Sequence, residues 1–100
     1  MPIAVLLEIP GCTLEQYREV IARVGLAPPA PRRPEGLLVH TGGPMAGGWR
    51  VFDVWEAREP YERFVAEQVR PAVQAAGVPP FTPRVYPLEN FVAQSRCAVA

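Results

Sequence analysis

The stretch from Gly48 to Val73 constrains the fold of this chain more than any other. Its first part alternates between two sets of side chains, Trp49, Val51, Asp53 and Trp55 against Arg50, Phe52, Val54 and Glu56, which is the period-two pattern of a β-strand. Both sets are largely apolar, so the strand is expected inside a sheet. Glu59-Pro60 then opens a helix, because proline is tolerated in a first turn. Apolar residues recur through this helix at helical spacing: Tyr61, Phe64, Val65, Val69, Ala72 and Val73.

The remaining segments predict three more strands and one more helix. Thr13 and Gln16 form a capping-box pattern at the start of a helix that ends at Gly25. Pro71 predicts a break or kink in the later helix. The expected strands are Met1–Ile9, Gly36–Thr41 and Arg84–Val92, and the glycine-rich run Gly42–Gly48 is expected to be a flexible hairpin connection. The order strand, helix, strand, strand, helix, strand indicates an α+β, ferredoxin-like split β-α-β-β-α-β fold with a four-stranded antiparallel sheet.

The length of 100 residues is that of one domain. We expect residues 1–93 to form it and residues 94–100 to be a C-terminal tail without a recognisable pattern. The proline-rich segment Ala27–Pro34 is interpreted as a stiff surface loop rather than a linker or a peptide ligand.

Charge and hydropathy exclude several classes of partner. The net charge is zero and the charges are dispersed, so neither nucleic acid nor an anionic membrane is an expected partner. The apolar run Ile3–Leu7 is too short to span a membrane, and a cytoplasmic location is expected. Cys12 and Cys97 have no nearby cysteine or histidine partner in sequence and are interpreted as free thiols.

The sheet is expected to carry apolar residues on both faces, with helices on only one of them. Leu37, Val39, Phe52 and Val54 are predicted to share the face without helices. An apolar face of this kind is typically buried against a partner. We therefore expect a homodimer formed sheet against sheet, with Arg50 at the dimer interface.

The chain resembles the dimeric α/β-barrel superfamily, and within it the small antibiotic-biosynthesis-monooxygenase-like proteins. The resemblance is carried by Gly48-Trp49, by Val54-Trp55-Glu56-Ala57 with Glu59, by Tyr61 and Phe64, and by Pro71. It implies a dimeric barrel built from ferredoxin-like domains. Members include cofactor-independent monooxygenases of aromatic polyketides, haem-degrading enzymes, isomerases, polyketide cyclases and proteins without known activity.

The haem-degrading branch combines a tryptophan at the strand end with a histidine on the following helix that ligates iron. Trp55 matches the tryptophan, but no histidine occurs from Glu56 to Ala100. The iron ligand has no counterpart, and no zinc-binding spacing occurs either. No cofactor and no metal are expected.

The candidate catalytic pair is His40 and Asp53, which are the only histidine and the only aspartate of the chain. If residue numbers across the hairpin sum to 91, His40 faces Val51, Leu38 faces Asp53, and the pair are diagonal neighbours about 7 Å apart on one face. A carboxylate beside an imidazole fixes its tautomer and raises its basicity, as a general base requires. A one-residue slip would place them on opposite faces. The alternative is a structural hydrogen bond, or two unrelated residues.

Aromatic residues are the candidate walls of a substrate pocket. Trp55, Trp49, Tyr17, Tyr61 and Tyr86 are predicted to bind a hydrophobic or aromatic small molecule, although each is also a candidate core residue. With His40 as base and Asp53 as its orienting partner, the resemblance implies a small cofactor-independent enzyme of secondary metabolism. It would act on an enolisable, polyketide-like aromatic by base-initiated monooxygenation or cyclisation. The alternatives are an isomerase or lyase using the same base, and a non-catalytic dimeric binding or accessory protein.

Overall fold

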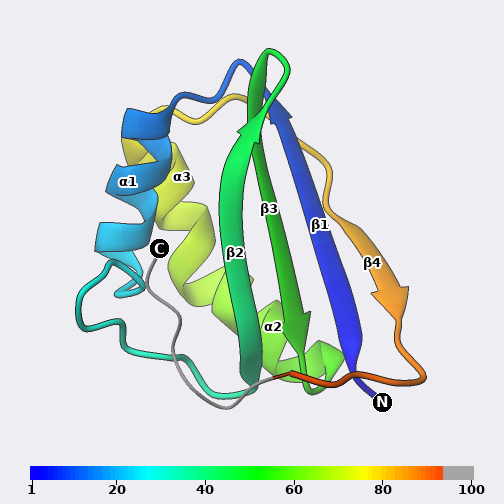
Figure 1. Cartoon of the computed structure of the whole chain (residues 1–100). Coiled ribbons are helices and arrows are strands. Elements are labelled where there is room, and N and C mark those ends of the chain that lie inside the picture. Colours follow the sequence, from blue (N-terminus) through cyan, green and yellow to red (C-terminus); the bar gives the residue numbers. More distant parts are fainter. Residues whose placement is uncertain (94–100) are drawn as a thin grey trace.

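The computed structural model describes residues 1–93, in which one four-stranded sheet carries helices on one face (Figure 1). The tail predicted at residues 94–100 lies outside the described residues. The elements are β1 (Ile3–Pro10), α1 (Leu14–Arg23), β2 (Leu37–Met45), β3 (Gly48–Trp55), α2 (Arg58–Phe64), the π-helical segment η1 (Val65–Val69), α3 (Arg70–Ala76) and β4 (Arg84–Pro87). This order confirms the predicted α+β, ferredoxin-like arrangement.

The strand order is β2-β3-β1-β4, and every pair of neighbours is antiparallel. The two most apolar strands, β1 and β3, are therefore the central ones, as their composition predicts. The predicted extension of β4 to Val92 is wrong. Pro87 pairs with Ile3, the first residue of β1, so β1 offers no partner to residues beyond it.

The hairpin between β2 and β3 is tighter than the sequence suggested. Only Ala46 and Gly47 separate the two strands, and Gly47 adopts a φ of +74°, a conformation that glycine takes without steric cost. The run Gly42–Met45 is a paired part of β2, so its prediction as a flexible connection is wrong.

The two-residue turn sets the register of the hairpin. Met45 pairs with Gly48 and His40 pairs with Asp53, so the partner numbers sum to 93 instead of the predicted 91. A shift by two residues preserves the alternation between faces, so His40 and Asp53 share a face as predicted.

A bulge in β2 changes the position of Leu37. The register shifts between Leu37 and Val39, so Leu37 pairs with Trp55 while Val39 pairs with Val54. Leu37 is 4% exposed and belongs to the core on the helical side. Its predicted place on the other face with Val39 is therefore wrong, because a bulge changes which face a residue points to.

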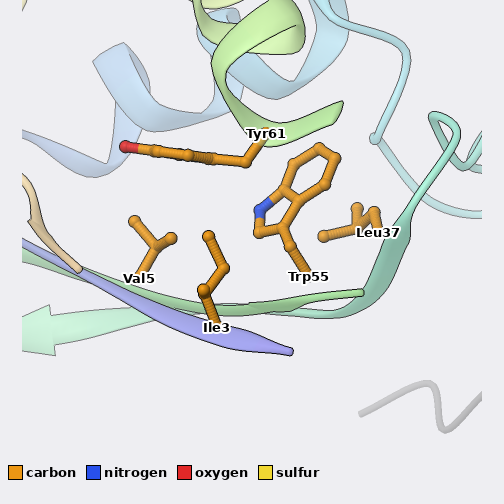
Figure 2. Close-up of a cluster of buried hydrophobic side chains, with 5 residues drawn as sticks. All are labelled: Ile3, Val5, Leu37, Trp55 and Tyr61. Atoms are coloured by element: carbon orange, nitrogen blue, oxygen red, sulfur yellow. The ribbon is translucent and has the colours of Figure 1, made fainter. Parts of the chain in front are cut away.

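The core lies between the sheet and α2. Figure 2 shows its five buried members, Ile3, Val5, Leu37, Trp55 and Tyr61. Trp55 is 1% exposed and meets Tyr61 edge to face, with ring centroids 5.8 Å apart. Its indole nitrogen, which has no hydrogen-bond partner among the described residues, lies on the side facing the Tyr61 ring (Figure 2). The electron-rich ring face is a favourable neighbour for that N–H.

A break or kink was predicted at Pro71; the helix does not break there, and the irregularity is a π-helical segment directly before it. Directly before it, η1 takes the wider π-helical pattern, in which the Arg70 N–H bonds to the Val65 carbonyl five residues back. Proline has no N–H and its ring clashes with the carbonyl four residues earlier. One widened turn accommodates this ring, so the helix continues as α3.

Within residues 1–93, no helix covers the other face of the sheet (Figure 1). We call this the open face. Phe52 and Tyr86 are 41% and 46% exposed there. Glu8 bonds to Arg50 at 3.0 Å and lies 3.6 Å from Arg84. The described helices include none that is long and apolar enough to cross a membrane.

Candidate functional site

His40 and Asp53 form a hydrogen-bonded pair on the helical face of the sheet. They lie directly opposite each other on β2 and β3, and 2.7 Å separates His40 Nδ1 from Asp53 Oδ1. Their side chains are 20% and 14% exposed. The pairing is closer than the predicted diagonal arrangement because the register differs by two residues.

Tyr17 completes a chain of three polar groups. Its hydroxyl lies 2.7 Å from His40 Nε2 and comes from α1, which packs over the sheet. An ionised Asp53 can only accept, so Nδ1 of a neutral His40 carries the proton and Nε2 is an acceptor. The Tyr17 hydroxyl therefore donates to Nε2, and the Nδ1–H donates to Asp53.

The Tyr17 ring is held by its neighbours on β2 and β3. It packs against Trp49 with centroids 4.9 Å apart and stacks parallel to His40 at 6.1 Å. It also lies over Gly42, where a Cβ atom would be 2.4 Å from the Tyr17 hydroxyl and Cζ. Gly42 thus makes room for the phenol.

These contacts of Tyr17 were missed by the sequence interpretation, which treated it as a pocket wall. One signal was present. Gly42 follows His40 by two residues and so lies beside it on the same face, leaving a space that a side chain from the helical layer can fill.

The three polar groups lie at the wall of an otherwise apolar pocket between the sheet, α1 and the later helix. Its volume is about 70 Å³. The other lining residues are Leu7, Ile9, Cys12, Val20, Ile21, Val24, Leu26, Val51, Phe64, Val69, Val73 and Val78. An apolar lining with a few convergent polar groups is typical of small-molecule sites, which usually enclose about 300 to 1,000 Å³, several times the volume of this pocket.

The structure brings only some of the predicted site residues to this pocket. Tyr17, His40 and Asp53 line it. Trp49 contacts the site through the Tyr17 ring, whereas Trp55 and Tyr61 belong to the neighbouring core cluster. Tyr86 pairs with Ala4 on the open face, so it is separated from the pocket by the sheet.

Burial and the charge of Asp53 raise the pKa of the two nearby phenols, Tyr17 and Tyr61. Burial raises the pKa of Tyr17 to about 12, and the negative charge of Asp53 adds to this shift. The pKa of Tyr61 is raised by burial first and by Asp53 second. Burial also raises the pKa of the Cys12 thiol. A neutral Tyr17 can donate to His40, as its geometry requires.

Metal ligation finds no support in the described part of the chain. Residues 1–93 contain no cluster of three or more histidine, cysteine, aspartate or glutamate side chains that could hold an ion.

The fold and the pocket together define a small ferredoxin-like domain with a hydrogen-bonded histidine in an apolar cavity. The chain matches no known family model and no curated protein. Several solved structures share its fold. A protein of Deinococcus radiodurans assigned as an antibiotic biosynthesis monooxygenase superposes with a TM-score of 0.63 at 16% identity, over 96% of this chain and all of that one (100%).

A point mutant of SnoaB, a cofactor-independent oxygenase from Streptomyces nogalater, gives a TM-score of 0.60 at 16% identity and covers 93% of this chain and 96% of that chain. A structural-genomics protein, YJCS, gives 0.58 at 12% identity over 88% and 97% of the two chains. The chain thus has the fold of antibiotic-biosynthesis-monooxygenase-like proteins. At these identities the likeness concerns the fold alone.

Proposed function

We propose that this protein is a small cofactor-independent enzyme that removes a proton from an enolisable aromatic, polyketide-like substrate. The observation that carries the proposal is the hydrogen bond of 2.7 Å between His40 and Asp53 at the wall of an apolar pocket. The carboxylate holds His40 in the tautomer whose Nε2 accepts a proton and stabilises the imidazolium that results.

Proton removal leads to two outcomes. A deprotonated phenol or enol carries carbanion character on a ring carbon, which can give an electron to oxygen and become monooxygenated. The same carbon can instead attack a carbonyl of its own molecule and close a ring. The solved structures with this fold include a cofactor-independent oxygenase, which supports the monooxygenase route.

The pocket favours an apolar substrate but needs to enlarge to admit a ring. Its volume of about 70 Å³ is roughly half that of a cavity that holds benzene, about 150 Å³. The wall best suited to move is η1, because none of its residues is fully buried and it does not carry Tyr17. Outward movement of η1, which contributes Val69 to the wall, would widen the pocket and leave Tyr17 in place.

The open face supports a proposed homodimer. Phe52 and Tyr86 are both large and more than two-fifths exposed on it. Exposed aromatics on a sheet face are typical of an interface. A second copy of this chain, paired sheet against sheet, would bury them.

The proposed activity is tested with 1,5-dihydroxynaphthalene, a two-ring phenol. Its monooxygenation to a hydroxynaphthoquinone consumes one molecule of oxygen and releases water, so an oxygen electrode and product absorbance report the same event. We expect turnover by the wild type and a loss of about 100-fold or more in His40→Gln, the size of a general-base contribution. Asp53→Asn is expected to lower turnover as well, because it removes the charge that stabilises the imidazolium.

The outcomes separate the candidate functions. Product formed without oxygen uptake from a substrate that also carries a carbonyl side chain would favour cyclisation. A second candidate is a non-catalytic binding protein, which is favoured by the occupation of His40 Nε2 by Tyr17. Saturable binding of the naphthol with equal, negligible turnover in wild type and His40→Gln would support that function and overturn the enzymatic one.

A further inference from the structure

We propose that the Tyr17 hydroxyl, and not the His40 ring, is the group that contacts the substrate, and that it relays the substrate proton to His40. This inference rests on the proposed function and adds to it a catalytic residue and a narrower substrate class. It follows from the way the hydrogen bonds of His40 are distributed.

Both ring nitrogens of His40 are already occupied. Nδ1 bonds to Asp53 and Nε2 to the Tyr17 hydroxyl, each at 2.7 Å. An imidazole has no third position from which to accept a proton. A substrate can therefore reach the base only by displacing Tyr17 or by acting through it.

Displacement of the phenol alone is opposed by its packing. The Tyr17 ring lies between Trp49 and His40, and it rests on the bare backbone of Gly42. Rotation of the phenol away from Nε2 would break the hydrogen bond and both ring contacts. Movement of η1, which borders the pocket through Val69, would by contrast admit a ring without displacing Tyr17, because Tyr17 belongs to α1.

The phenol oxygen is suited to an intermediate role. Its proton is donated to His40, which leaves its lone pairs free to accept a hydrogen bond from a molecule in the pocket that Tyr17 lines. Since its pKa is raised to about 12, a free tyrosinate is disfavoured, and the oxygen must gain one proton as it gives up another.

The step balances without an additional reactant. The substrate O–H bond breaks and its proton forms a new O–H bond on Tyr17. The original Tyr17 O–H bond breaks and its proton forms an N–H bond at His40 Nε2. The products are a substrate anion and an imidazolium whose Nδ1–H is bonded to the Asp53 carboxylate.

This geometry restricts the substrate class. The group that meets Tyr17 must be a hydrogen-bond donor, so the substrate is a phenol or an enol that presents its hydroxyl to the pocket. A methyl ether of the same ring system fills the space but has no proton to transfer.

The inference is tested by turnover and by a crystal structure with 1,5-dihydroxynaphthalene. We expect Tyr17→Phe to lose about 100-fold or more in kcat with little change in KM, a loss comparable to that of His40→Gln. In the complex we expect a naphthol hydroxyl against Tyr17 Oη, with the Tyr17–His40 hydrogen bond retained. The 15N NMR shifts of His40 should show the same Nδ1–H tautomer in Tyr17→Phe as in wild type.

Three results would overturn the relay. One is a Tyr17→Phe variant that keeps or exceeds wild-type turnover while His40→Gln is inactive, which leaves the proposed function intact with His40 as the direct base. Another is a complex in which the naphthol contacts Nε2 itself or does not occupy the pocket. The third is a changed His40 tautomer in Tyr17→Phe, which would make Tyr17 a positioning residue. Full turnover by His40→Gln would instead refute the proposed function.

Discussion

Substitution of Gly42 by alanine should cost far more stability than a glycine-to-alanine change usually does. The added Cβ would lie 2.4 Å from the Tyr17 hydroxyl, whereas ordinary contact begins at 3.4 Å. The phenol must therefore retreat by roughly 1 Å, the difference between these distances. Its hydrogen bond to Nε2, now 2.7 Å, would lengthen beyond the hydrogen-bonding range.

The size of the effect follows from two contributions. Loss of the hydrogen bond costs about 1 kcal/mol and forced repacking about 1 to 3 kcal/mol, together about 2 to 4 kcal/mol. Urea unfolding followed by fluorescence should show a midpoint lowered by about 1 to 2 M. Gly43→Ala is the matched control, because the neighbouring glycine has no atom within 4 Å of its added Cβ. We expect Gly43→Ala to change stability by about 0.5 kcal/mol or less.

A double-mutant cycle tests whether Tyr17 is the residue with which the added Cβ atom of Gly42→Ala clashes. In a Tyr17→Ala background the clash is absent, so Gly42→Ala should cost little more than Gly43→Ala does. The reasoning fails if Gly42→Ala is as mild as Gly43→Ala in the wild type. It also fails if its cost persists unchanged after Tyr17 is truncated.

Two further predictions concern the phenol and the open face. Because the pKa of Tyr17 is about 12 when folded and about 10 otherwise, the unfolded chain loses this proton first as pH rises. The stability that the protonated Tyr17 phenol contributes is therefore complete below pH 10 and is lost as the pH rises from 10 to 12. Between pH 10 and 12, the free energy of unfolding measured with urea should decline less steeply for Tyr17→Phe than for the wild type. An identical decline in the two proteins would count against the raised pKa of Tyr17. Phe52→Arg should convert the proposed dimer to a monomer in analytical ultracentrifugation. The control Leu14→Arg alters an apolar residue of similar exposure, 42% against 41%, on the helical side and should leave the mass unchanged; a monomeric wild type would refute the dimer.

The parts of the fold that depend on local pattern were predictable from the sequence. The capping box of Thr13 and Gln16 is formed as expected, since both partners lie within one turn. Gly77 ends α3 with a φ of +68°, a conformation that favours glycine. The alternation in β3 placed Asp53 on one face with both tryptophans of that strand, and the assumed register, although two residues off, was of the right parity to place His40 on that face as well.

The predictions that were wrong or missing concern strand pairing and contacts between the helices and the sheet. The hairpin register depended on whether Gly42–Met45 would pair with β3. The glycine and proline content of this run predicted an unpaired connection, but all four residues pair because β3 supplies a complete partner strand. The bulge that moves Leu37 into the core leaves no local sequence signal. The Tyr17–His40 contact joins a helix to a strand 23 residues away. Periodicity placed each residue on its apolar face but could not bring the two together.

The π-helical turn before Pro71 also changes which residues of the later helix face the pocket. Phe64 and Val69, five positions apart, both line it, although in a regular α-helix they would point about 140° apart. The wider turn of η1 realigns them, and Val73 follows one ordinary turn later. In evolutionary terms the segment behaves as a one-residue insertion that the helix absorbed without ending. Deleting one residue between Phe64 and Val69 would therefore place these two side chains four positions apart, on one face of an ordinary α-helix, and would leave Val69 and Val73 lining the cavity.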